Sequence, residues 1–181
     1  MNAQKISYPP GRLNPAGVKK AIYAFVEDIL SFPVLDDPET ATTLASLVEI
    51  DTAIVMKPGK QFFEYYGTLE EGELKCTIVG PNDGKGFENS YEFSYPGNDP
   101  IALGHLAATA NRQIVWIVTE KNNVNRVVGS LEDPALLISA DYSSGKKVAD
   151  GRKTVITVKA SAGTPAPIYT VPLASLLAPA A

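Results

Sequence analysis

The chain has 181 residues, of which 45% are hydrophobic and 20% charged, with a formal net charge of -4. This length supports one domain with a full core, and the single cysteine, Cys76, excludes an intramolecular disulfide and fits assembly in a reducing cytoplasm. The basic residues are scattered along the chain, which disfavours tight nucleic-acid binding. The sequence has no long apolar stretch, so we expect no membrane span and no export signal.

The N-terminal part of the chain is predicted to be an arm followed by a strand and a loop. Residues 1–17 contain three prolines and two glycines, which resist both helix and central strand. Residues 19–29 place apolar side chains on both faces of an expected strand. The acidic, proline-broken segment 33–45 is expected to be a long loop.

The next segments predict a hairpin and then a half-buried strand. Residues 47–56 have a strand pattern with one polar face, and the turn residues 57–60 precede an aromatic strand at 62–66. Residues 73–79 alternate between polar and apolar side chains, which places Cys76 on the apolar face. We expect Cys76 to be buried there as a small hydrophobic side chain.

A helix signal follows the turn at 80–84 and an aromatic strand at 90–95. Asn98 or Asp99 can cap a helix over about 99–111, because Pro100 suits the first helical position. We expect this helix to lie on a sheet. Residues 114–119 (IVWIVT) are continuously apolar and predict a strand that is buried on both faces.

The C-terminal third predicts three more strands and an irregular end. A turn at 121–123 leads into a strand at 125–129, and further strands are expected at 136–142 and 154–160. Residues 163–181 are rich in proline and alanine and are expected to be extended or irregular.

These elements predict a mainly β protein with one flanking α-helix, built as a β-sandwich or barrel. Residues 1–17 form an extended arm, residues 18–162 a single β-rich domain, and residues 163–181 a Pro/Ala-rich tail. Many turns between short strands favour this class.

Candidate catalytic and metal sites in the sequence have simpler interpretations. The single histidine, His105, falls in the predicted helix among apolar residues, and no G-x-S-x-G motif accompanies it. The segment 79–86 has Gly-Lys after a strand, but its glycine spacing does not fit a phosphate loop and favours a hairpin. Two acidic clusters could hold a hard cation or be solvated: Asp36, Asp37 and Glu39, and Glu70, Glu71 and Glu73. We expect no enzyme activity, no cofactor and no metal.

Seven aromatic residues on the predicted strands allow two interpretations. They could form a flat platform for carbohydrate, or they could pack in the core or against another subunit. A non-enzymatic β-sandwich module that binds carbohydrate or protein therefore stays open as an alternative function. The seven are Phe62, Phe63, Tyr65, Tyr66, Tyr91, Phe93 and Tyr95.

The chain resembles the tail tube proteins of tailed bacteriophages along most of its length. The similarity is carried by six segments: Tyr23 to Ile29, Lys57 to Lys60, Gly84 to Asn89, Tyr95 to Pro100, Ala110-Asn111, and Pro165 to Tyr169. The resemblance implies a sandwich that forms hexameric rings, stacked into a hollow tube, with sheets of adjacent subunits closing a continuous inner barrel. It also implies that the arm, the 30–45 loop and the tail bridge rings.

The resemblance implies a location and partners as well. The protein would belong to the virion tail, assemble in the host bacterial cytoplasm away from membranes, and contact tape-measure and tail-terminator or baseplate proteins. DNA would pass transiently through its lumen without specific binding. A lumen that conducts DNA should be neutral to acidic, and the polar strand residues Glu49, Asp51 and Glu64 are candidates for its wall.

Overall fold

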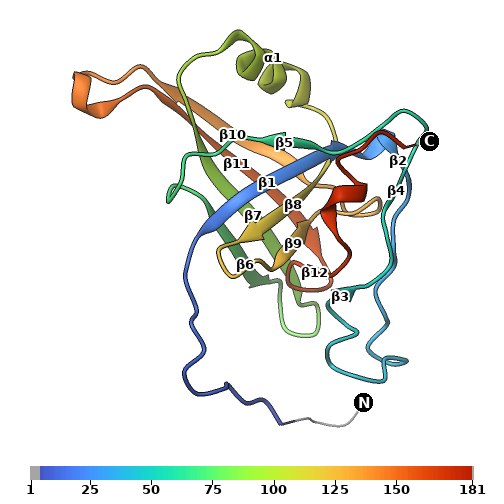
Figure 1. The fold of residues 1–181 in the computed structure, drawn as a ribbon. Coiled ribbons are helices and arrows are strands. Elements are labelled where there is room, and N and C mark those ends of the chain that lie inside the picture. The colour runs from blue at the N-terminus through green and yellow to red at the C-terminus, as the bar shows by residue number, and fades with distance from the viewer. Residues whose placement is uncertain (1–4, 181) are drawn as a thin grey trace.

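The computed structural model describes residues 5–180. Its strands form a six-stranded sheet ordered β3-β12-β9-β8-β1-β5, a four-stranded sheet ordered β10-β11-β7-β6, and a small pair, β2-β4 (Figure 1). The strands are β1 Val18–Phe25, β2 Ile29–Ser31, β3 Glu49–Ile50, β4 Val55–Met56, β5 Phe63–Tyr65, β6 Glu73–Val79, β7 Gly86–Pro96, β8 Ile114–Glu120, β9 Asn125–Val128, β10 Leu136–Ser143, β11 Lys153–Ala162 and β12 Ile168–Tyr169. The helix is α1 Pro100–Thr109, and the 3-10 turns are η1 Val26–Asp28, η2 Val148–Asp150 and η3 Leu173–Ser175.

The two large sheets pack face to face and enclose the main core. Strand β8 lies in the middle of the six-stranded sheet, and its residues 114–119 are all buried, as the apolar run predicted. Ile114, Trp116 and Val118 face the four-stranded sheet, where they meet Tyr91 and Phe93 of β7 among other residues. The mainly β class with one flanking helix is therefore confirmed.

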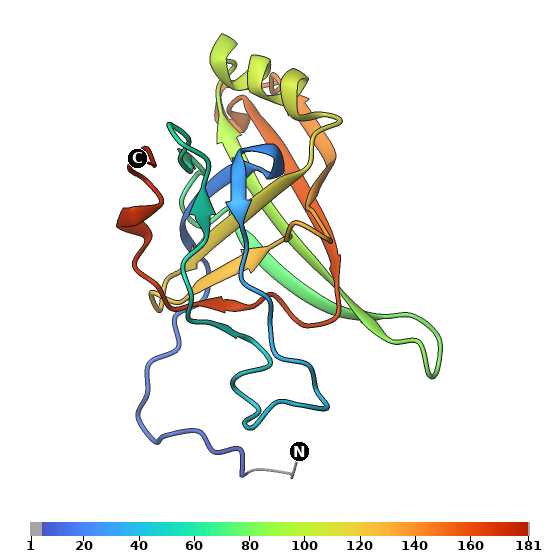
Figure 2. The same cartoon turned by 90° about the vertical axis from the view of Figure 1, so that its right-hand side faces the viewer.

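The opposite face of the six-stranded sheet carries a second hydrophobic layer. Val115 and Ile117 of β8 contribute to it, together with Phe62, Tyr169 and Leu176, each at most 1% exposed. Irregular chain covers this face: the segment that follows β2 and the C-terminal segment after β11 (Figure 2). Residues 163–180 are mostly irregular, as predicted, but they contain β12 and η3, and their buried side chains belong to the fold.

The helix α1 confirms the capping prediction. The Asp99 side chain accepts a hydrogen bond from the Ile101 backbone N–H at 2.8 Å, and Pro100 occupies the first turn. The helix lies across one end of the sandwich (Figure 1). Only Ala102 and Thr109 are buried, and Ile101 is 81% exposed, so the helix covers the core with a narrow face.

The predicted strand at 47–56 and the hairpin after it are wrong. This segment contains only the two-residue strands β3 and β4, which pair with different partners: β3 runs parallel to β12, and β4 runs antiparallel to β2. The turn at 57–60 exists, with the Lys60 N–H donating to the Lys57 carbonyl, but β5 pairs with β1. Long-range pairing therefore overrides the local hairpin signal.

The predicted continuous strand at 19–29 is also divided. Its first part is β1, which places Ala21 in the main core and Ile22 in the second layer, so both faces are apolar as expected. The β1-β8 ladder ends with the Val26 N–H donating to the Gln113 carbonyl at 3.0 Å, and the 3-10 turn η1 then interrupts the strand before β2, because the Ile29 N–H donates back to the Val26 carbonyl. Residues 5–17 form an exposed arm without strand or helix, and 33–45 is a loop with turns.

Strand β6 has the predicted extent but not the predicted burial. Leu74, Cys76 and Ile78 share one side, yet only Leu74 is half-buried, and Ile78 is 59% exposed. Cys76 is exposed, so its expected burial is wrong. The cause is position: β6 is the outermost strand of its sheet, and the tip of the β6-β7 hairpin projects away from the sandwich (Figure 2).

One buried polar side chain attaches the C-terminal segment to β7. Asn89 is 1% exposed; its Oδ1 accepts from the Ala166 N–H at 3.0 Å, and its Nδ2 donates to the Thr164 carbonyl at 3.1 Å. These bonds satisfy backbone groups that would otherwise lie unpaired beside the core.

We expect Asn89→Ala to lower the free energy of unfolding by about 2 to 3 kcal/mol, because it removes two hydrogen bonds and leaves a buried N–H unpaired. Chemical denaturation measures the change. The exposed Asn111→Ala is the matched control and should stay within about 0.5 kcal/mol of the original protein. Equal effects of the two substitutions would contradict a role for Asn89 in holding this segment.

Candidate assembly surface

The fold leaves the outer face of the four-stranded sheet uncovered. In β11, residues 154, 156, 158 and 160 are buried against the core, and the side chains between them point outward. The pairing register aligns these outward residues with mostly polar residues of the neighbouring strands, and Lys159 with Leu136 of β10. The charged members of this face are Glu73, Lys75, Glu88, Glu92, Asp141, Lys153 and Lys159.

Each lysine of this face is paired with a carboxylate. Lys159 lies 2.9 Å from Glu88, Lys75 lies 2.8 Å from Glu73, and Lys153 lies 2.9 Å from Glu71 at the rim of the sheet. The hydrogen bond from Lys153 lowers the pKa of Glu71, and the hydrogen bond with Glu73 raises the pKa of Lys75. The face therefore carries little free positive charge.

Two carboxylates of the face have no ion-pair partner within residues 5–180. Glu92 accepts a hydrogen bond from the Thr157 hydroxyl at 3.3 Å, and Asp141 lies on β10 opposite Val155. The net charge of the face is thus neutral to slightly negative.

The sheet ends in a long free edge on each side. Strand β6 pairs only with β7, and β10 pairs along its length only with β11, so one row of backbone groups on each outer strand has no strand partner. Both edge strands have seven or more residues, whereas the edge strands of the six-stranded sheet, β3 and β5, have two and three. Long unprotected edges favour pairing with a strand of another molecule.

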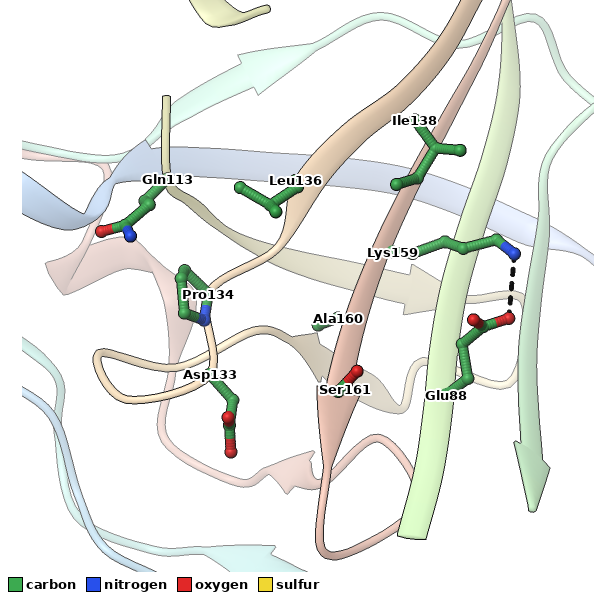
Figure 3. A pocket seen from close by; sticks show the side chains of 9 residues that line it. All are labelled: Glu88, Gln113, Asp133, Pro134, Leu136, Ile138, Lys159, Ala160 and Ser161. Carbon is green, nitrogen blue, oxygen red and sulfur yellow. Dashed lines mark hydrogen bonds and ion pairs between the residues drawn. The ribbon is translucent and has the colours of Figure 1, made fainter. Parts of the chain in front are cut away.

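Apolar side chains accompany both free edges. On β6, Ile78 and Val79 are 59% and 40% exposed. On β10, Leu136 and Ile138 are 46% and 55% exposed, and they line a shallow pocket of about 290 Å³ with Lys159 and other residues (Figure 3). The two edges therefore offer apolar surface together with unpaired backbone.

The three predicted lumen residues do not lie on this face. Glu49 is on β3 and Glu64 is on β5, which are the two opposite edges of the six-stranded sheet, and Asp51 follows β3 in an irregular segment. Glu64 approaches Lys20 at 3.5 Å. The structure does not bring the three residues together.

The sequence contained a signal for the residues that do share a face. The segments ELKCTIV at 73–79 and TVITVKA at 154–160 alternate more regularly than 47–56, which broke into two short strands. Period-two alternation is the mark of a strand with two different faces. The strand pattern could not show which side would be covered by a second sheet.

His105 belongs to an aromatic cluster between the helix and the sandwich. Its ring lies edge-on to Tyr23 and Tyr65, at 4.7 and 4.9 Å between centroids, and Trp116 lies beneath both tyrosines. Both ring nitrogens of His105 are buried without a hydrogen-bond partner, and burial lowers its pKa. No carboxylate or nucleophile is within hydrogen-bond distance of this ring in the described chain.

The seven aromatic residues considered in the sequence are divided between the main core, the second layer and the surface. Phe62, Tyr91 and Phe93 are at most 2% exposed, and Tyr65 is half-buried, with burial raising its pKa to about 12. Tyr95 is half-buried as well, so only Phe63 and Tyr66 are exposed. Five of the seven aromatic residues therefore pack in or against the core and do not form a flat outer platform.

Residues 79–86 form the β6-β7 hairpin turn, where Gly80 has φ +102° and a Cβ would collide with the Gly84 carbonyl. Among residues 5–180, no three His, Cys, Asp or Glu side chains are grouped to hold a metal ion. None of the helices in the described part is long and apolar enough to cross a membrane.

We expect His105→Phe to reduce the loss of stability at acidic pH. Because the folded pKa of His105 lies below its ordinary value of 6.5, the unfolded state binds more protons, and stability falls as pH drops below 6.5. Each unit between the two pKa values contributes about 1.4 kcal/mol. Denaturation at pH 8 and at pH 5 measures the loss of stability between the two pH values for each protein. An equal loss in both proteins, even with a uniform offset from altered packing, would contradict the assignment.

No protein-family model, no curated protein and no solved structure matches this chain. What the chain does is therefore inferred from its own surfaces. The most informative features are the two free edges of the four-stranded sheet and its outer face, on which each lysine is paired with a carboxylate.

Proposed function

We propose that this protein is a structural subunit that assembles with copies of itself into stacked rings, forming the tube of a bacteriophage tail. The observation that carries the proposal is the four-stranded sheet, which has a free edge on each side and an exposed face without unpaired lysines. In this assembly, β6 of one copy pairs with β10 of the next. The resemblance in sequence to tail tube proteins supports the same mode of assembly.

Strand directions favour this contact. The four strands alternate in direction, because each neighbouring pair is antiparallel. The outer strands β6 and β10 therefore run in opposite directions, so identical copies placed side by side continue the antiparallel ladder. A contact between two different surfaces of the same subunit closes into a ring when the rotation per copy fits, and hexameric rings are the expectation from the resemblance.

Continuous sheets would also bury the apolar side chains at the edges. Ile78 and Val79 on β6 and Leu136 and Ile138 on β10 lose water contact when the two strands meet. The gain per side chain is about 1 to 2 kcal/mol for partial burial. Paired backbone groups and apolar burial then act at the same seam.

The outer face of the four-stranded sheet suits the wall of a DNA channel. Repeated rings would multiply any attraction between lysines and phosphates, so a passage that does not hold DNA needs its cations neutralised. Here Lys75, Lys153 and Lys159 each have a carboxylate within 2.9 Å, and Glu92 and Asp141 add negative charge. We therefore assign the lumen to this face in place of Glu49, Asp51 and Glu64.

The N-terminal arm also fits a stacked assembly. The arm at 5–17 is exposed along its length and carries Ile6 and Leu13, which are 91% and 88% exposed. Its only side-chain hydrogen bond among the described residues runs from the Tyr8 hydroxyl to the Arg12 carbonyl. Such an arm is free to contact a second ring.

We expect Ile138→Pro to block assembly while the subunit still folds. Ile138 lies at the register shift between Leu137 and Ser139, where proline is tolerated, and the substitution alters the edge that the next copy must approach. The matched control is Ile138→Thr, which keeps the backbone N–H and favours strand. Negative-stain microscopy and ultracentrifugation should give rings or tubes for the original and the Thr variant and monomers for the Pro variant. Unchanged assembly of the Pro variant would remove β10 from the contact.

We expect tubes of the double variant Glu92→Lys and Asp141→Lys to retain double-stranded DNA that the original tubes release. Each exposed lysine adds a phosphate contact in every subunit, and binding should weaken steeply with added salt. Filter binding of linear DNA at low and moderate salt measures this. The control, Glu49→Lys with Asp51→Lys, makes the same change in charge away from the sheet face. Equal retention by both variants would contradict the assignment of the lumen.

A further inference from the structure

A groove opens beneath the long loop at the end of the molecule opposite to α1. Its volume is about 590 Å³, and the loop 32–38, the turn 129–133 and the segment 162–167 contribute most of its lining. The apolar part includes Phe32, Leu35, Ile50, Val127 and Leu131. Nothing within residues 5–180 fills this space.

The rim of the groove is acidic. Asp36, Asp37, Glu132 and Asp133 all line it, and none of them forms an ion pair within the described chain. No lysine or arginine is among the lining residues. The groove therefore favours an occupant with an apolar centre and positive charges beside it.

The tip of the β10-β11 hairpin has this composition. Val148 is fully exposed, at 103% of its reference area, and Lys146 and Lys147 precede it directly. Arg152 lies directly before β11 and is exposed. Lys146, Lys147 and Arg152 form no ion pair among residues 5–180.

The tip is also held in one shape before it meets a partner. The Asp150 carboxylate accepts hydrogen bonds from the backbone N–H groups of Lys146 and Lys147 at 3.0 and 2.9 Å. Gly145 has φ +71°, and a Cβ there would collide with the Gly151 carbonyl. A preformed tip loses little conformational freedom on binding.

The tip and the groove lie at opposite ends of the subunit. In Figures 1 and 2 the hairpin tip is at the end near α1, and the long loop is at the far end. A tip cannot reach the groove of its own chain, but copies stacked in the same orientation bring the two together. This contact is heterologous, so it repeats along a stack.

We propose that the hairpin tip of one copy inserts into the acidic-rimmed groove of a second copy in the next ring. Val148 enters the apolar part, and Lys146, Lys147 and Arg152 face the carboxylates of the rim. The inference rests on the proposed stacking of rings and names the contact that joins them. It is separate from the β6-β10 seam, which joins subunits within a ring.

Cross-linking between two full-length proteins tests this contact directly. Both carry Cys76→Ser, because Cys76 is exposed. One adds Val148→Cys and the other adds Leu131→Cys in the groove, and a short bismaleimide is applied to the mixture. We expect a cross-linked heterodimer, whereas Ile101→Cys on α1, which is 81% exposed and outside the groove, replaces Leu131→Cys as the control and should give none.

Charge reversal supplies an independent measurement. Lys146→Glu with Lys147→Glu should lower the yield of heterodimer about tenfold, a loss equivalent to about 1.4 kcal/mol. Adding Asp36→Lys and Glu132→Lys to the groove protein should restore it. The yield should also fall at high salt, because exposed charges are screened.

The outcomes separate the inference from the proposed function. Tubes without this cross-link would overturn the tip-in-groove contact and leave the tube standing, with the N-terminal arm as the next occupant to cross-link. A cross-link without rings or tubes would support the contact and contradict the tube. If the folded protein gives neither the cross-link nor rings or tubes, both the tip-in-groove contact and the proposed tube are overturned.

Discussion

The structure depends on one constraint: β8 carries apolar side chains on both faces over residues 114–119, so the sheet that it centres must be covered twice. A second sheet covers one face, and irregular chain covers the other. The inner face of the four-stranded sheet is therefore buried against the six-stranded sheet, and its outer face stays exposed. The surface available for assembly is therefore set by the most buried strand in the protein.

The irregular covering explains why proline-rich and acidic segments belong to the fold. The C-terminal segment contributes Tyr169 and Leu176 to the second layer, and the Tyr169 hydroxyl accepts a hydrogen bond from the buried Ile54 N–H at 3.2 Å. Asn89 attaches the same segment to the other sheet. Side chains thus supply the polar partners that a third sheet would have supplied through its backbone.

Local patterns in the sequence predicted those elements whose cause is local. The Asp99 cap and Pro100 placed α1, and continuous apolarity placed β8. Patterns were insufficient where pairing is long-range: 47–56 broke because its two ends join strands at opposite ends of the chain, β12 and β2. Burial of Cys76 was mispredicted for a related reason, since alternation defines two faces but not how far another sheet covers them, and β6 lies at the edge of its sheet. The lumen candidates inherited that same ambiguity.

An even number of strands in the four-stranded sheet has a consequence for how such a subunit can diverge. With three or five strands, both outer strands would run in the same direction, and identical neighbours would have to meet in parallel at every seam. Head-to-tail growth by antiparallel pairing therefore permits strands to be gained or lost only as whole hairpins. In the proposed assembly, the circumference of a ring would then change in steps of two strands per subunit.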